Sequence, residues 1–114
     1  MTLKQRRSIF SLNFAKLIIW INEQPGYTCG ICEVMRTPEQ AAIYAKKGVG
    51  IIHSLHLDSC AGDLAIWLNG VYVESTDGYK FAGDYWESLH PQNRWGGRFK
   101  DGDHFEMREV INLG

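Results

Sequence analysis

LAIWLNGVYV, residues 64–73, decides how this chain folds, because two apolar runs flank an Asn-Gly pair. Asn69-Gly70 favours the two-residue turn whose twist matches that of paired antiparallel strands. Leu64–Leu68 and Val71–Val73 are therefore predicted to form a hairpin. The chain is expected to build a small antiparallel sheet around it.

The N-terminal segment carries one apolar stripe at helical spacing. Phe10, Phe14, Leu17 and Ile21 recur at intervals of four, three and four residues, which predicts a helix over residues 4–22. The stretch is too short and too polar to span a membrane, and it lacks the small-residue cleavage site of a secretory signal. We therefore expect a helix of the folded domain.

The remaining segments complete an α+β pattern. We expect a strand over residues 27–35, a helix over 37–48, a helix over 79–89, a loop over 91–97 and a final strand over 104–111. Helices come early and strands late, so the helices are expected to pack on a small antiparallel sheet. No repeat or linker interrupts the 114 residues, and residues 1–114 are predicted to form a single domain.

Composition and cysteine usage exclude several classes of function. With a formal net charge of −1, the chain lacks the excess of positive charge that nucleic-acid binding requires. Three cysteines, Cys29, Cys32 and Cys60, cannot form a closed set of disulfides, which fits a reducing compartment. Cys29 and Cys32 fall in a predicted strand, whereas a redox pair needs an exposed helix N-terminus. Structural thiols are the better interpretation.

Two segments carry side chains suited to catalysis. SLHLDSCAGDL (residues 54–64) contains His56 and Asp63, and WGGRFKDGDHFE (residues 95–106) contains Asp101 and His104. Catalytic zinc takes three protein ligands and leaves a fourth position open for water. His56, Asp63 and His104 would supply that set, and a carboxylate outside it would accept the proton of the water. The spacing alone also fits scattered polar side chains without a shared role.

These motifs resemble those of one zinc peptidase family, the D,D-carboxypeptidases, D-alanyl-D-alanine dipeptidases and phage L-alanyl-D-glutamate endopeptidases. The family carries a Ser-x-His-x6-Asp motif, which appears here as Ser54, His56 and Asp63. It also carries a later Glu/Asp-x2-His motif, which appears here as Asp101 and His104.

Further segments extend the resemblance to about residues 27–107. Ala61 stands two residues before the ligand Asp, and Trp95-Gly96-Gly97 is similar to a run in the phage endopeptidase branch. Residues 36–40 resemble the segment that carries the family's substrate arginine. Ser59 stands where the family often has Gly, a departure that leaves every proposed ligand in place.

The resemblance implies a role for each site residue. His56, Asp63 and His104 would bind Zn²⁺ at the sheet and its adjacent loops, and Asp101 would be the general base. Arg36 would hold the substrate carbonyl and stabilise the oxyanion of the tetrahedral intermediate.

The roles of four other residues stay open between two alternatives. Ser54 would contact substrate or only tie down the ligand loop, and Trp95 would form a groove wall or lie buried. Asp103 and Glu106 are alternatives to Asp101. Asp103 is expected to point to the strand face opposite His104, whereas Glu106 shares the face of His104 and could orient a ligand.

The function implied is hydrolysis of a peptide bond in peptidoglycan stem peptides. The L-Ala–D-Glu bond is favoured by resemblance, in a monomeric phage endolysin that accumulates in the host cytoplasm until lysis. The alternatives are a D-Ala-D-Ala carboxypeptidase or dipeptidase and a zinc-binding module of the same fold without catalysis.

Overall fold

The computed structural model describes residues 1–33 and 60–109. Two α-helices, two 3₁₀ helices and five strands occur there: α1 (Leu3–Glu23), β1 (Tyr27–Glu33), β2 (Ala61–Leu68), β3 (Val71–Tyr72), η1 (Asp77–Tyr79), α3 (Lys80–Leu89), β4 (Asn93–Trp95), η2 (Gly96–Phe99) and β5 (His104–Met107). The helix predicted over residues 37–48 lies outside the described residues.

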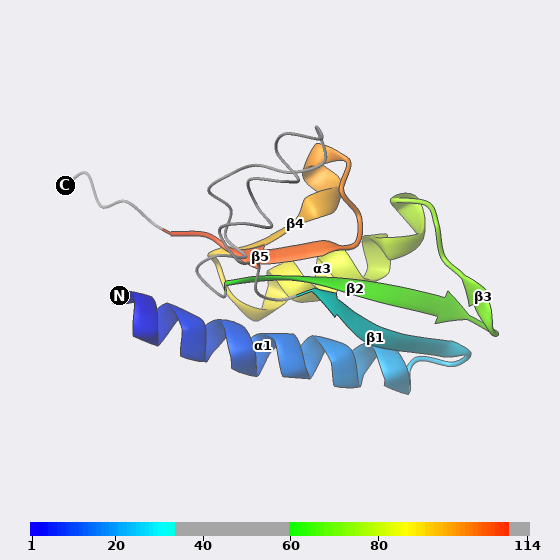
Figure 1. Cartoon of the computed structure of the whole chain (residues 1–114), viewed down its shortest axis with the longest axis horizontal. Coiled ribbons are helices and arrows are strands. Elements are labelled where there is room, and N and C mark those ends of the chain that lie inside the picture. The colour runs from blue at the N-terminus through cyan, green and yellow to red at the C-terminus, as the bar shows by residue number, and fades with distance from the viewer. Residues whose placement is uncertain (34–59, 110–114) are drawn as a thin grey trace.

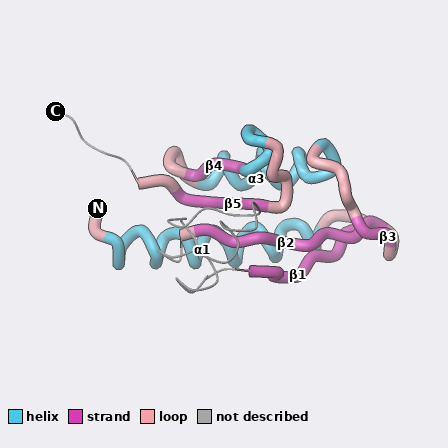
Figure 2. The backbone as a smooth tube through the Cα atoms, turned by 45° about the horizontal axis from the view of Figure 1, so that its top comes forward, coloured by secondary structure: helices cyan, strands magenta, loops and turns pink. Residues whose placement is uncertain are grey.

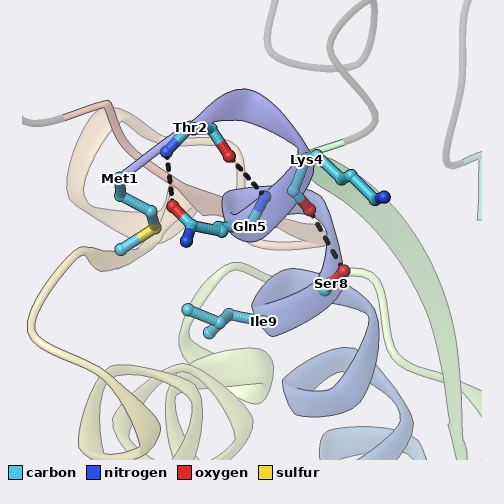
Figure 3. A pocket seen from close by; sticks show the side chains of 6 residues that line it. All are labelled: Met1, Thr2, Lys4, Gln5, Ser8 and Ile9. Carbon is cyan, nitrogen blue, oxygen red and sulfur yellow. Dashed lines mark hydrogen bonds between the residues drawn. The ribbon is translucent and has the colours of Figure 1, made fainter.

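α1 confirms the predicted N-terminal helix and begins with a capping box. The Thr2 backbone N–H donates to Gln5 Oε1 at 2.8 Å, and the Gln5 N–H donates to Thr2 Oγ1 at 3.1 Å (Figure 3). This exchange satisfies backbone donors that the first turn would otherwise leave unpaired. Within the described part of the chain, no helix is both long and apolar enough to cross a membrane.

The predicted hairpin forms at the expected turn. Asn69 and Gly70 both have positive φ, 51° and 80°, as the two central residues of this turn type require. Leu68 therefore pairs with Val71, and Trp67 pairs with Tyr72. β2 begins at Ala61, three residues earlier than predicted, and this extension carries Asp63 inside the strand.

The sheet is antiparallel, with the order β1–β2–β5–β4 and with β3 paired to β2 (Figure 1). The C-terminal β5 thus lies between β2 and β4. The loop predicted over residues 91–97 is wrong at Asn93–Trp95, because these residues pair with β5. Three residues are too few for a periodic pattern, so only the long-range pairing reveals this strand.

One face of the sheet packs on α1 and α3 to form the core (Figure 2). Alternation along the strands directs Leu64, Phe105 and Met107 into that core, with 0% exposure each. The same alternation places Asp63 and His104 on the other face. The α+β architecture predicted from the sequence is confirmed, and the sheet face opposite the helices carries the polar residues.

The aromatic contacts between α1 and α3 generate a stability prediction. Phe14 stacks on Phe10 at 5.1 Å between ring centroids and meets Trp86 edge-on at 6.2 Å. Phe14→Ala should lower the free energy of unfolding by about 3–5 kcal/mol, because a buried aromatic ring leaves a cavity. Leu12→Ala, on the same helix and 59% exposed, should change it by less than about 0.5 kcal/mol. Urea unfolding measures both, and similar losses for the two variants would contradict this account.

Candidate active site on the polar face of the sheet

The centre of the site is a contact across two neighbouring strands. Asp63 on β2 lies directly opposite His104 on β5 in the antiparallel register. The Oδ1 atom of Asp63 is 3.1 Å from Nδ1 of His104. The structure therefore brings together two residues that lie 41 positions apart in the sequence, one from each predicted motif.

The other nitrogen of the His104 ring is held by Glu106, two residues along the same strand. His104 Nε2 is 2.8 Å from Glu106 Oε1. Glu106 Oε2 accepts hydrogen bonds from Arg94 Nη2 at 2.7 Å and from Arg94 Nε at 3.1 Å. The prediction that Glu106 shares the face of His104 is confirmed. Arg94 was missed, because the segment before Trp95 was predicted to be a loop.

Charges within this group shift the pKa values of its members. Burial acts to lower the pKa of His104, but hydrogen bonds to Asp63 and Glu106 and the charges of both carboxylates raise it to about 9. Burial acts to raise the pKa of Glu106, but His104 and Arg94 together lower it. The two carboxylates therefore favour the protonated form of the His104 imidazole between them.

Two further carboxylates adjoin this pair. Asp103 hydrogen-bonds to Asp101 and feels the charge of Asp63, and burial together with these neighbours raises the pKa of Asp103 to about 7. The expectation that Asp103 points away from the site is wrong, because strand alternation begins only at His104 and Asp103 belongs to the preceding turn. The Asp103 carbonyl also accepts from Leu64 N–H at 3.0 Å, which fastens this turn to β2.

Trp95 supports the segment that carries Asp101. Its side chain is buried and its indole N–H donates to the Gly102 carbonyl at 2.7 Å. The ring lies between Gly83 and Gly97, where an added Cβ would come within 2.2 Å of ring atoms. Glycine is therefore required at both positions for this packing. Of the two interpretations of Trp95, the geometry favours the buried ring over the groove wall.

The cysteines differ in their surroundings. Cys29 faces α1, where Asn22 Nδ2 donates to its sulfur at 3.4 Å, and burial raises the pKa of this thiol. Burial and the charges of Asp103 and Asp63 raise the pKa of Cys32, so this thiol lies near the site. A raised pKa disfavours the reactive thiolate, which agrees with structural thiols, and no disulfide joins Cys29, Cys32 and Cys60 to one another.

Three predicted site residues, Arg36, Ser54 and His56, lie outside the described residues. Within residues 1–33 and 60–109, no group of three or more His, Cys, Asp or Glu side chains is placed to hold a metal ion. Asp63 and His104 nevertheless fit two corners of a zinc site. Tetrahedral zinc bonds of about 2.0–2.1 Å separate two donor atoms by about 3.3 Å, close to the 3.1 Å between Oδ1 and Nδ1.

A pH dependence of stability follows from the pKa of His104. The folded protein raises this pKa from 6.5 to about 9, so the folded state binds the proton more tightly than the unfolded chain. The resulting stabilisation, on the order of 3 kcal/mol, is fully present below about pH 6.5 and is lost as the pH rises through 9. The metal-free protein should therefore be less stable at alkaline pH.

Urea unfolding in the presence of a chelator, compared between slightly acidic and alkaline buffers, measures this loss. His104→Gln should flatten the pH dependence, because it removes the titrating ring. His90→Gln is the matched control, because His90 lies in a separate turn and accepts from Gln92 N–H; this variant should keep the wild-type dependence. Equal slopes in all three proteins would remove His104 as the cause.

Comparisons with known proteins bear on the fold. No protein-family model matches the chain, and a search of curated protein sequences finds no match. Among solved structures, the crystal structure of the Serratia marcescens L-Ala D-Glu endopeptidase ChiX is similar, with a TM-score of 0.66 and 21% sequence identity. The similarity covers 82% of this chain and 79% of that chain. At this level of identity, the comparison establishes that the two proteins share a fold.

Proposed function

We propose that this chain is a zinc-dependent peptidase that cuts peptidoglycan stem peptides, with the L-Ala–D-Glu bond as its target. The observation that carries the proposal is the 3.1 Å approach of Asp63 Oδ1 to His104 Nδ1, with the carboxylates of Asp101 and Asp103 beside them. The fold shared with an L-Ala D-Glu endopeptidase supports the same class of reaction. Because one fold can host many functions, the proposal depends on the side chains.

In this proposal, His56, Asp63 and His104 hold the zinc ion. A zinc ion held there would supply Lewis-acid chemistry: it would polarise the carbonyl of the scissile bond and lower the pKa of water toward neutral. Asp63 contributes an anionic oxygen and His104 contributes Nδ1, because Glu106 occupies Nε2. Both donors are oriented by the sheet before any ligand arrives.

Asp101 moves the proton during the reaction. Its side chain is exposed and hydrogen-bonds to Asp103, so water and substrate can both reach it. Asp101 accepts the proton of the attacking water and then donates it to the leaving amine. Asp103 helps to hold the Asp101 carboxylate in place, and Arg36 stabilises the oxyanion that develops on the carbonyl oxygen.

A pocket beside Asp101 could receive the residue on the amine side of the cut bond. The pocket has a volume of about 210 Å³, and its lining includes Ser75, Thr76 and Lys100. The leaving amine must lie within hydrogen-bond reach of Asp101, so the residue on the amine side of the cut bond would occupy this pocket. Among the described residues, the carboxylates of Glu74, Asp101 and Asp103 line the pocket against one cation, Lys100. Its charge therefore gives no preference for glutamate over alanine, and the products of the reaction decide which bond is cut.

Replacement of Asp101 tests the proposed reaction. Asp101→Asn should lower the rate of peptidoglycan cleavage by at least about 100-fold, because general acid–base catalysis contributes about 10²–10⁴-fold. Asp101→Glu should retain part of the activity, since a carboxylate remains. Asp77→Asn, an exposed carboxylate in η1, is the control and should cleave like the wild type. The assay is digestion of purified peptidoglycan, with the new termini identified by mass spectrometry.

Zinc removal and the identity of the products separate this proposal from its alternatives. New D-Glu amino-termini that disappear with a chelator and return with added zinc are the expected result. Released D-Ala would instead assign the carboxypeptidase or dipeptidase activity. Zinc binding without cleavage of any stem peptide, unchanged by Asp101→Asn, would leave a zinc-binding module. Release of the enzyme from the host cytoplasm at phage lysis is part of the same proposal and would be tested by expression with and without a membrane-permeabilising protein.

A further inference from the structure

Four side chains form a closed ring of contacts beside the candidate zinc ligands. Glu106 links His104 to Arg94 through the hydrogen bonds described above. The Arg94 guanidinium carbon lies 5.0 Å from the centre of the Phe99 ring. The Phe99 ring in turn meets the His104 ring edge-on, with 5.7 Å between centroids. His104 is therefore held from one side by a carboxylate and from another by an aromatic ring.

The hydrogen bonds in this ring divide the Glu106 carboxylate between two partners. Arg94 Nε and Nη2 both donate to Oε2 of Glu106. The second oxygen, Oε1, is left to face Nε2 of His104 at 2.8 Å. Arg94 thus fixes the rotation of the carboxylate, and the carboxylate fixes which nitrogen of His104 faces Asp63.

Burial makes this arrangement costly for stability alone. The Glu106 side chain is 6% exposed and the Arg94 side chain is 38% exposed. Apolar residues of similar size often stabilise a protein as well as a buried ion pair does, because the charges lose their hydration. This cost is offset where the geometry is good and further hydrogen bonds satisfy the charges, as the bonds from Arg94 and His104 do for Glu106.

We propose that Arg94 and Glu106 are positioning residues that hold the His104 ring with Nδ1 toward Asp63 and thereby set the metal affinity of the site. This inference rests on the proposed zinc-dependent function. Hydrogen bonds from carboxylates to the far nitrogen of a ligating histidine orient the ring, and their loss commonly weakens metal binding by about 10–100-fold. Arg94 acts on His104 indirectly: it orients the Glu106 carboxylate, which in turn orients the His104 ring.

The test measures zinc affinity in variants of the full chain by competition with a chromogenic chelator. Glu106→Gln should weaken zinc binding by about 10–100-fold. Arg94→Met should weaken it several-fold, and Arg94→Lys should recover part of the loss because a cation remains near Glu106. Arg98→Met is the matched control, because Arg98 is exposed and pairs with Glu87 instead. This control should stay within about two-fold of the wild type.

The visible absorption spectrum of the cobalt-substituted protein provides a second readout. A changed orientation of His104 alters the ligand field, so the spectrum should change in Glu106→Gln and Arg94→Met and stay unchanged in Arg98→Met. Thermal unfolding of each metal-free variant verifies that it is folded. The Arg94 side chain is partly exposed, so its variants are expected to fold. They test the inference even if Glu106→Gln does not fold. Wild-type affinity and an unchanged spectrum in Arg94→Met and folded Glu106→Gln would overturn the inference.

A separate measurement distinguishes failure of this inference from failure of the proposed function. If the wild type binds no zinc, the zinc-dependent function fails, and the ring of contacts is then tested in the metal-free protein by ¹⁵N–¹H NMR. The Nε2–H signal of His104 should be protected from exchange with water in the wild type and less protected in Glu106→Gln and Arg94→Met. Equal protection in all three proteins would overturn the positioning role.

Discussion

The contact between Asp63 and His104 depends on the register of β2 against β5, and the rest of the site depends on that contact. A slip of one residue in either strand would turn the side chain of Asp63 or His104 into the core, because side chains alternate between the faces of a sheet. The buried residues Leu64 and Phe105 prevent such a slip, since each would lose its place in the core. The apolar face of the sheet therefore positions the polar face.

The aromatic core contacts the strand that carries the site, β5, at its backbone and at Phe105. The Trp86 indole N–H donates to the Glu106 carbonyl at 3.0 Å, and the Trp86 ring meets Phe105 edge-on with 6.2 Å between centroids. α3 thus fixes the strand that carries His104 and Glu106. Trp95 does the same for the turn before that strand through its bond to Gly102. Trp86 and Trp95, which pack in the core, therefore stabilise the backbone of β5 and of the turn before it through these two hydrogen bonds.

The sequence predicted the local features of this molecule better than its long-range ones. The apolar stripe of α1 and the Asn69-Gly70 turn are set by residues close together in the chain, and both are confirmed. β4 was missed because it is a strand only through its pairing with β5. Arg94 was missed for the same reason, since its partner Glu106 lies 12 residues away across that pairing. Periodicity does not predict that Asp63 and His104 share a site, whereas the resemblance of their motifs to the zinc peptidase family does.

Charge balance links the ion pairs of this site to the proposed metal. In the metal-free state, the carboxylates of Asp63 and Glu106 face two cations, protonated His104 and Arg94. A divalent metal at Nδ1 would displace one proton from His104 and leave the group with one more positive charge. Burial and neighbouring carboxylates raise the pKa of Asp103, so this carboxyl group can offset that charge by losing its proton. Asp103 also hydrogen-bonds to Asp101, the proposed base, so under the proposed function metal binding and proton transfer would depend on one arrangement of charges.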